Sequence, residues 1–367
     1  MTYRLIHLLD DRSLGGVNKM LAIFNSEVLA EVSTSAFDYD AIGSQTLATR
    51  YDADVIVLHA PIRWAYLPFI LSLRWRNRKA KIVHVEHHYS RAFEALHVKD
   101  KGRFRALLRI ASEMFDAIVC VSNAQAEWFR EAVPTCDRKL WSINPHTQHP
   151  GLCTLPVPDF HSGSPLRIGA YGRFDAQKGF DLLIPAFKAG AFGASQLLIG
   201  GYGPDEGMLH ALAEGHPDIE FFGEVEDVRE FLARCDVVAV PSRREPFGLV
   251  CLEARQAGRP ILVSGADALP DQAEGCGAVL DFSDHDQIRQ IVSALTPNLL
   301  QVFAASARAS TFGLGVEIQA EWIRLLHNLT HTPKRPAPPL AYFPNCPRSR
   351  SGSASSIHYL EASVGDV

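Results

Sequence analysis

Short apolar runs alternate along the chain with longer segments whose apolar residues recur at helical spacing. Each run is bounded by glycine, proline or polar residues and is too short to be a helix, so it predicts a buried strand. Strands that alternate with helices indicate parallel βαβ units and an α/β fold with doubly wound sheets. The predicted strands span residues 4–9, 55–59, 82–86, 117–121, 167–171, 196–200, 219–222, 237–240 and 260–263.

A stretch rich in proline and glycine, residues 145–165, separates the first four predicted strands from the rest. It has no hydrophobic periodicity and therefore predicts a linker. The chain then forms two Rossmann-like domains, residues 1–160 and 161–330, whose parallel sheets face a central cleft. Ligands of such folds bind at the carboxyl ends of the strands, so functional residues are expected in the loops that follow them.

Two helical segments, residues 285–296 and 299–328, follow the last predicted strand, and we expect the final helices to pack back toward the first domain. The chain then becomes rich in proline and afterwards in serine. Such a composition does not build a core, so it predicts a disordered tail over residues 331–367.

The composition is typical of a globular protein with an ample core, because 47% of the 367 residues are apolar and 21% are charged. A net charge of −5 gives no reason to expect a nucleic-acid partner. The seven cysteines include no Cys-x-x-Cys pair and predict reduced core thiols in the cytoplasm. The first residues lack the apolar region of a signal peptide, and no apolar run is long enough to cross a bilayer. We therefore expect neither secretion nor a membrane span.

Positive charge is concentrated in one part of the chain, since residues 74–109 hold 11 Lys and Arg against Glu86, Glu94 and Asp100. Residues 61–79 mix aromatic and aliphatic residues with a basic end, as an interfacial helix does. We expect residues 61–109 to contact an anionic membrane at its inner face. The alternative is a core helix whose long cationic side chains cover apolar surface.

Two glutamates lie on either side of the point where a loop becomes a helix. A strand ends before Pro241, and apolar residues begin a helix near Gly248, so Glu245 precedes the helix and Glu253 lies within it. The N–H groups of Phe247, Gly248 and Leu249 are then unpaired donors that favour phosphate. Carboxylates beside a phosphate site can accept hydrogen bonds from sugar hydroxyls. The alternative is structural, because an acid near a helix start also offsets the helix dipole.

Three further segments follow predicted strands. Gly172 and Arg173 begin a loop that runs to Lys178 before the next helix, and its two cations could neutralise a diphosphate. Gly15 and Gly16 precede a helix predicted over residues 17–29, where glycine lets the backbone approach a ligand closely. Solvated cations and a flexible turn are the structural alternatives for these two loops.

The third segment is a histidine cluster at the end of the strand over residues 82–86. His87 or His88 is placed at the mouth of the cleft, where imidazole can bind a sugar hydroxyl or assist proton transfer. His59 and His84 are expected to be ordinary strand-end histidines with satisfied hydrogen bonds. No third ligand stands at metal spacing, and the Asp-x-Asp matches at 52–54 and 284–286 suit turns and caps, so no metal site is expected.

These motifs together resemble glycosyltransferase family 4. The resemblance rests on the E-x7-E pattern around Pro-Phe-Gly, on Arg173 and Lys178 in their loop, and on the Gly15-Gly16 pair. It covers about residues 1–330 and is strongest over 166–264. It implies the GT-B fold and a retaining, metal-independent transfer of a sugar from a nucleoside diphosphate, without a cofactor.

The resemblance assigns a role to each motif. Glu253 would bind the ribose and Glu245 the donor sugar, while Arg173 and Lys178 would hold the diphosphate. Gly172 borders that loop, and the amides of Phe247, Gly248 and Leu249 would complete the phosphate site. Gly15 and Gly16 would border the diphosphate from the first domain, and His87 would lie near the sugar. The catalytic residues expected are thus Arg173, Lys178, Glu245 and His87.

The expected partners are a nucleotide sugar and a glycan or lipid-linked acceptor, in the synthesis of a cell-surface polysaccharide or lipopolysaccharide. Two alternatives stay open: a sugar-nucleotide epimerase of the same fold, and a non-catalytic protein that binds a nucleotide sugar. The chain departs from the family where Asn144 is followed by proline rather than glycine, which affects the hinge and not the donor site.

Overall fold

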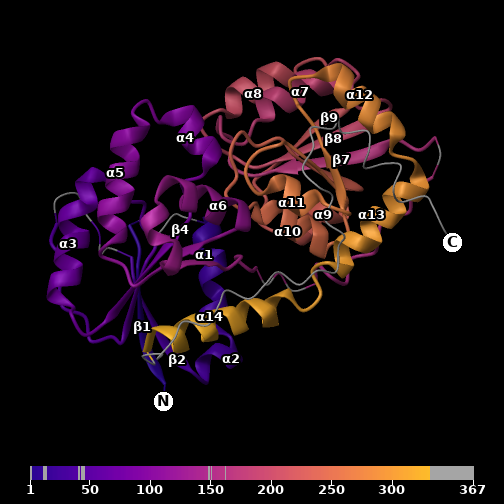
Figure 1. The fold of residues 1–367 in the computed structure, drawn as a ribbon. Helices are drawn as coiled ribbons and strands as arrows, with labels where there is room; N and C mark the ends of the chain where they lie inside the picture. Colours follow the sequence, from indigo (N-terminus) through magenta and orange to yellow (C-terminus); the bar gives the residue numbers. More distant parts are fainter. Residues whose placement is uncertain are drawn as a thin grey trace. The chain divides into compact units, whose positions relative to one another are not determined.

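The computed structural model describes residues 2–330 apart from residues 11–14, 40, 41, 43–45, 148, 150 and 162. The described residues belong to one compact unit that ends at Thr330 (Figure 1). The tail predicted to be disordered, residues 331–367, lies outside the described residues.

Two six-stranded sheets form the framework, and every pair of neighbouring strands is parallel. The first sheet has the order β2-β1-β3-β4-β5-β6 and the second β12-β11-β10-β7-β8-β9. The strands of the first sheet are β1 (Tyr3–Leu8), β2 (Ser33–Asp38), β3 (Val55–Leu58), β4 (Lys81–Glu86), β5 (Ala117–Cys120) and β6 (Leu140–Ser142). Those of the second are β7 (Leu166–Tyr171), β8 (Ser195–Gly200), β9 (Ile219–Gly223), β10 (Val237–Val240), β11 (Ile261–Val263) and β12 (Gly277–Val279).

Helices connect the strands in both halves. The first half contains α1 (Gly15–Leu21), η1 (Ala22–Asn25), α2 (Glu27–Ala30), η2 (Trp64–Tyr66), α3 (Leu67–Arg76), α4 (Arg91–His97), α5 (Lys101–Ser112), α6 (Asn123–Ala132) and η3 (Pro134–Lys139). The second half contains α7 (Phe180–Lys188), α8 (Glu206–Ala213), α9 (Val228–Ala233), α10 (Leu249–Gln256), α11 (Leu269–Ala273), α12 (His285–Ala294), α13 (Pro297–Ala309) and α14 (Leu314–Thr330). The predicted doubly wound α/β architecture is confirmed.

Each sheet is buried on both faces, which explains why its central strands are continuous apolar runs. In β3, Ile56 and Leu58 pack into one core while Val55 and Val57 pack into another. The second of these cores also contains Trp322 of α14, and Figure 1 shows α14 beside α2 of the first half. The last helix therefore leaves the second half and covers the first sheet.

Three strands escape prediction from the sequence, and all three are edge strands: β2, β6 and β12. Their residues are mostly half-buried, so the strands lack the continuous apolar run of a central strand. Two helix predictions are also wrong in extent. The segment 17–29 begins earlier, at Gly15, and is interrupted by η1, and the segment 299–328 divides into α13 and α14 at Gly313, whose φ is 80°.

Candidate functional site

The loop between β10 and α10 places Glu245 before the helix and Glu253 inside it, as predicted. Gly248 caps α10 in the left-handed region, with φ 97° and ψ 74°. A Cβ at this position would lie 3.2 Å from Glu245 Cγ, so the turn requires glycine. The N–H groups of Phe247, Gly248 and Leu249 donate no hydrogen bond to another described residue. They are therefore available to an anion at the helix start.

Glu253 is almost sealed from solvent, with 1% of its surface exposed, and three side chains share its charge. Oε1 accepts hydrogen bonds from Lys19 Nζ at 3.0 Å and His149 Nε2 at 3.1 Å, and Oε2 accepts one from Tyr171 Oη at 2.6 Å. Burial by itself would raise the pKa of Glu253, but these bonds and the Lys19 charge hold it below its ordinary value. Burial and the Glu253 charge in turn raise the pKa of Tyr171 well above its usual range.

Glu245 and Lys178 form an ion pair across two loops of the second half. Lys178 Nζ lies 2.6 Å from Glu245 Oε2, which also accepts a hydrogen bond from Ser242 Oγ at 3.2 Å. Arg173, in the same loop as Lys178, extends into solvent with 61% of its side chain exposed. The carboxylate that pairs with Arg173 is Asp175, 4.0 Å away. The loop thus offers one cation held at Glu245 and one that is largely exposed and only loosely paired.

Asp267 joins this site to the first half of the chain. Its φ is 49°, the one left-handed value found for a non-glycine residue in the described part of the chain. Oδ2 accepts hydrogen bonds from Glu245 N at 2.9 Å and Ser90 Oγ at 2.8 Å, and Oδ1 accepts one from Ala92 N at 2.9 Å. Ser90 Oγ also accepts from Phe93 N at 3.2 Å as the N-cap of α4, so one carboxylate connects the start of α4 with the backbone of Glu245.

His87, predicted to lie near the donor sugar, belongs to a row of three histidines at the carboxyl ends of β1, β3 and β4. His59 Nδ1 lies 2.9 Å from His87 Nε2, and His59 Nε2 lies 3.0 Å from His7 Nδ1. His7 and His59 are fully buried, whereas His87 is half-buried. Burial lowers the pKa of His7 to about 3, and burial with neighbouring histidines lowers the pKa of His59 and His87 well below the ordinary value. All three rings are therefore neutral near pH 7.

A cavity of about 470 Å³ lies in the first half, between η2, α4 and α5. Aromatic and cationic side chains line it, and its one carboxylate, Asp100, accepts the Arg103 N–H as the N-cap of α5. The Arg103 guanidinium lies 5.4 Å from the centre of the Trp64 ring. From the second half, the Arg244 guanidinium lies 5.4 Å from the Phe93 ring, which also lines the cavity. Burial lowers the pKa of Arg244 despite the charges of nearby carboxylates.

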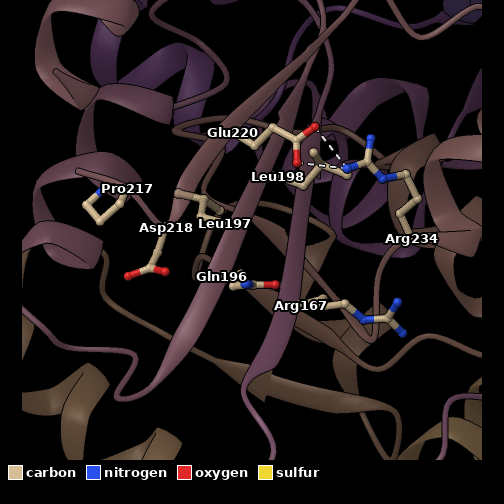
Figure 2. Close-up of a pocket in the computed structure, with 8 residues that line it drawn as sticks. All are labelled: Arg167, Gln196, Leu197, Leu198, Pro217, Asp218, Glu220 and Arg234. Carbon is tan, nitrogen blue, oxygen red and sulfur yellow. Dashed lines mark hydrogen bonds and ion pairs between the residues drawn. The ribbon is translucent and has the colours of Figure 1, made fainter. Parts of the chain in front are cut away.

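A second hollow lies away from these residues. Figure 2 shows it around Gln196, Asp218 and Arg234, at the amino ends of β7, β8 and β9. Its two arginines are already paired, since Arg234 contacts Glu220 at 2.7 Å and Arg167 contacts Asp236 at 2.5 Å. Ligands of parallel sheets bind at the opposite, carboxyl edge, so we assign no function to this hollow.

The remaining sequence predictions are placed as follows. Gly15 and Gly16 open α1, one turn before Lys19, which contacts Glu253. Within the described residues no group of three His, Cys, Asp or Glu side chains is arranged to hold a metal ion. Of the two Asp-x-Asp matches, Asp54 accepts bonds from Arg4, and Asp284 caps α12. No helix in the described ranges is long and apolar enough to cross a membrane.

Several residues of the site are not found by the sequence reasoning: Lys19, His149, Tyr171, Ser242, Asp267 and His7. His59 is named there, but as an ordinary strand-end histidine and not as the partner of His87. Lys19 offers a weak signal, because it stands on the helix that follows the glycine pair. His149 lies in the predicted linker, where a histidine has no distinguishing spacing. Asp267 gives no signal, because its left-handed backbone is visible only in the fold.

Comparisons with known sequences give two family matches. Residues 39–145 match the family described as Glycosyltransferase Family 4, and residues 165–298 match the one described as Glycosyl transferases group 1. The GDP-mannose-dependent alpha-(1-6)-phosphatidylinositol dimannoside mannosyltransferase of Mycobacterium tuberculosis is 32% identical over 165 residues, 43% of this chain and 43% of that protein. An uncharacterized 41.2 kDa protein in the cps region of Klebsiella pneumoniae is 29% identical over 131 residues, 34% of this chain and 35% of that protein. The chain thus spans less than half the length of these relatives.

Solved structures share the fold over most of the chain. HepE from Anabaena, in complex with UDP and glucose, has a TM-score of 0.68 at 16% identity and covers 90% of this chain and 100% of its own. Sucrose-phosphate synthase from Thermosynechococcus elongatus has a TM-score of 0.68 at 18% identity and covers 89% of this chain and 99% of its own. The predicted GT-B fold is confirmed.

Proposed function

We propose that this chain, which belongs to glycosyltransferase family 4, transfers a sugar from a nucleoside diphosphate to an acceptor at the junction of its two sheets. The ion pair of Lys178 with Glu245 carries the proposal. It places a cation and a carboxylate beside the free amides at the start of α10, and Glu253 follows about one turn later in that helix. A nucleotide sugar has the matching chemistry: a ribose, a diphosphate and a sugar in sequence.

The donor would lie along α10. Glu253 would accept hydrogen bonds from the ribose hydroxyls, and Lys178 and Arg173 would neutralise the diphosphate together with the α10 amides. Glu245 would then lose part of its contact with Lys178 and accept bonds from the sugar hydroxyls. Gly172 and the Gly15-Gly16 pair would let the backbone approach the phosphates.

The transfer would retain the anomeric configuration and use no metal. The bond between the anomeric carbon and the diphosphate oxygen breaks, and the acceptor oxygen forms its bond to the same carbon on the same face. The acceptor proton passes to the leaving phosphate oxygen. Such a step requires strong stabilisation of the departing diphosphate, of the order of 3 kcal/mol for one well-placed donor. Lys178 and Arg173 would supply it.

The acceptor would bind on the side of the aromatic and cationic cavity in the first half. We propose a glycan or a lipid-linked acceptor from cell-surface polysaccharide or lipopolysaccharide synthesis, reached at the inner face of an anionic membrane. The exposed side chains of Trp64, Leu71 and Trp75, at 44%, 42% and 63%, lie on η2 and α3 among the cations of residues 61–109. Apolar anchors next to cations favour binding to anionic lipid surfaces.

Release of nucleoside diphosphate from a panel of sugar nucleotides tests the activity. GDP and UDP sugars are the first donors to use, because a relative carries GDP-mannose in its name and a structural neighbour binds UDP. We expect release with one donor class in the presence of excess EDTA. Nucleotide binding without release would favour the non-catalytic alternative, and recovery of an epimerised donor would favour the epimerase.

Flotation with liposomes tests the membrane contact. We expect the protein to float with anionic vesicles at low salt and to be released at high salt, because screening weakens charge attraction. Trp75→Ser should reduce flotation. Phe312→Ser is the matched control, since Phe312 is 92% exposed but lies in the second half. Equal flotation with neutral and anionic vesicles would contradict the proposal.

A further inference from the structure

The row of His7, His59 and His87 crosses three neighbouring strands of the first sheet. β1, β3 and β4 are adjacent in the sheet, and each ring lies at or just beyond the carboxyl end of its strand. Successive ring centres are 5.3 Å apart, with interplanar angles of 23° and 19°. Two nitrogen-to-nitrogen hydrogen bonds, of 3.0 and 2.9 Å, run through the row.

The two ends of the row differ. His7 Nε2 is buried and has no hydrogen-bond partner, and the His7 ring stacks on Phe37 with centres 4.9 Å apart. At the other end His87 is half-buried, its Nε2 contacts His59, and its Nδ1 has no partner among the described residues. One end is therefore closed and apolar, and the other is open to a ligand.

A neutral imidazole carries one proton, so the row has only two arrangements that keep both hydrogen bonds. In the first arrangement each hydrogen bond is donated toward His7: His87 donates from Nε2 to His59, and His59 donates from Nε2 to His7. The proton of His7 is then on Nε2, where it is a buried donor without an acceptor. In the second, outward arrangement each hydrogen bond is donated toward His87: His7 donates from Nδ1 to His59, and His59 donates from Nδ1 to His87. The proton of His87 is then on Nδ1. Orphaned buried N–H groups are rarer than unfilled acceptors, so the outward arrangement is favoured.

We propose that His7 and His59 are positioning residues that fix His87 as the Nδ1–H tautomer, so that His87 acts as a hydrogen-bond donor and not as a base. The proposal rests on the proposed function only for the identity of the oxygen that receives this hydrogen bond, in the sugar of the donor. The buried end, at His7, determines which nitrogen of each ring carries the proton. The open end, at His87, presents one N–H group to the ligand.

Nitrogen-15 NMR of the histidine rings tests the tautomer without any assay of activity. The wild-type protein is labelled at histidine and measured at pH 7.5, and the signals of His87 are assigned by their loss in His87→Gln. We expect His87 to be neutral, with the proton on Nδ1 and none on Nε2. A proton on Nε2, or a charged ring, overturns the proposal whatever the protein catalyses.

Two replacements of His59 test the role of the row. Asn at this position can keep an amide donor where His59 Nδ1 stands, whereas Phe keeps a stacked ring without a donor. We expect His59→Asn to retain the Nδ1–H tautomer of His87 and His59→Phe to put a proton on its Nε2 in part of the molecules. An unchanged tautomer in a folded His59→Phe protein would overturn the role of His59.

Kinetics then separate a positioning role from general damage. For a sugar nucleotide that supports release, His59→Phe should lower kcat/KM by about tenfold, the loss of one hydrogen bond, and His59→Asn should recover most of it. The Kd of the nucleoside diphosphate, which lacks the sugar, should change less than that. If no donor supports release but the ring spectra are as expected, the proposed function fails and the tautomer assignment stands.

Discussion

At the scale of single residues, Glu253 shows how a buried charge can serve a ligand. A carboxylate has about four acceptor positions, and Lys19, His149 and Tyr171 occupy three of them. Lys19 comes from the first half, with 40% of its side chain exposed, so a ribose hydroxyl could replace it at lower cost than it could replace the buried Tyr171. The residue is therefore held in its charged form and in a fixed position, ready for the proposed ribose contact.

Replacing this carboxylate by an amide should weaken nucleotide binding. Glu253→Gln keeps the size of the side chain but removes the charge, and hydrogen bonds to charged groups contribute about 1.5 to 3 kcal/mol. We expect the Kd of the nucleoside diphosphate, measured by calorimetry, to rise about 10- to 100-fold. Glu220→Gln, in the hollow at the opposite edge of the second sheet, is the control and should leave it unchanged. An unaltered Kd in Glu253→Gln would argue against ribose recognition by this residue.

Lys178 should affect turnover more than binding. Removing one preorganised donor to a developing negative charge lowers turnover about 100- to 1,000-fold in other enzymes. We expect a loss of this size for Lys178→Ala in assays with excess EDTA, and a smaller one for Arg173→Ala, because Arg173 is more exposed. Arg289→Ala is the control, since this exposed arginine pairs locally with Asp286. Activity that requires an added divalent metal would contradict the proposed mechanism.

The motif residues of the site are predictable from sequence, but their partners are not. Glu245 and Lys178 stand in loops that follow strands, and Glu253 lies in the helix after its loop, all with recognisable spacing. Lys19 lies 234 positions from Glu253 and meets it only because α1 and α10 approach each other in the fold. No local pattern in either segment predicts that these two helices approach each other.

At the scale of elements, the start of α10 depends on one backbone conformation. Gly248 has φ 97°, and an alanine there would be strained in φ and would also meet Gln272 Nε2 at 3.2 Å. We expect Gly248→Ala to destabilise the protein by about 1 to 2 kcal/mol and to displace the three amides, with loss of nucleotide binding. Gly207→Ala in α8 is the matched control, because a Cβ there meets no atom within 4 Å. It should stabilise the protein by up to about 1 kcal/mol in urea unfolding.

The strands show which elements an apolar pattern can find. Central strands such as β3 and β5 are buried along their whole length and are predicted correctly. The edge strands β2, β6 and β12 are partly exposed, so their sequences resemble loops. Their pairing is determined by neighbouring strands and not by their own composition.

The histidine row should make the first sheet sensitive to mild acid. The folded pKa of His7 is about 3 and lies below its unfolded value of 6.5, so the unfolded state binds the proton first and stability falls as the pH drops below 6.5. His7 alone contributes about 1.4 kcal/mol of this loss per pH unit. We expect His7→Phe to reduce the difference in urea stability between pH 7.5 and 5.5 by about that amount. An equal pH dependence in wild type and His7→Phe would show that His7 is not buried in its neutral form.

At the scale of the whole molecule, contacts between the two halves surround the proposed donor site. Lys19 reaches Glu253, Ser122 Oγ donates to the Pro246 carbonyl at 2.6 Å, and Asp267 accepts bonds from the start of α4. α14 also returns from the second half to the core of the first. The site is therefore completed by the way the halves meet, which sequence motifs in either half alone do not specify.

Replacing Asp267 should show whether the contact between the two halves also determines donor binding. Asp267→Ala leaves Ala92 N and Ser90 Oγ without their acceptor, and a hydrogen bond to a charged group contributes about 1.5 to 3 kcal/mol. We expect the Ala92 amide to exchange hydrogen about 10- to 100-fold faster and the KM for the donor to rise, because the Glu245 backbone also loses its anchor.

Asp227→Ala is the matched control for this variant. Asp227 also accepts backbone hydrogen bonds, from Arg229 N and Glu230 N at the start of α9, but within the second half alone. Asp227→Ala should speed amide hydrogen exchange locally in α9 and leave both the exchange of the Ala92 amide and the KM for the donor unchanged. If Asp267→Ala changes exchange at α4 but not the KM, the junction is a structural contact. If both change together, the position of Glu245 depends on how the two halves meet, and the donor site is a property of their junction.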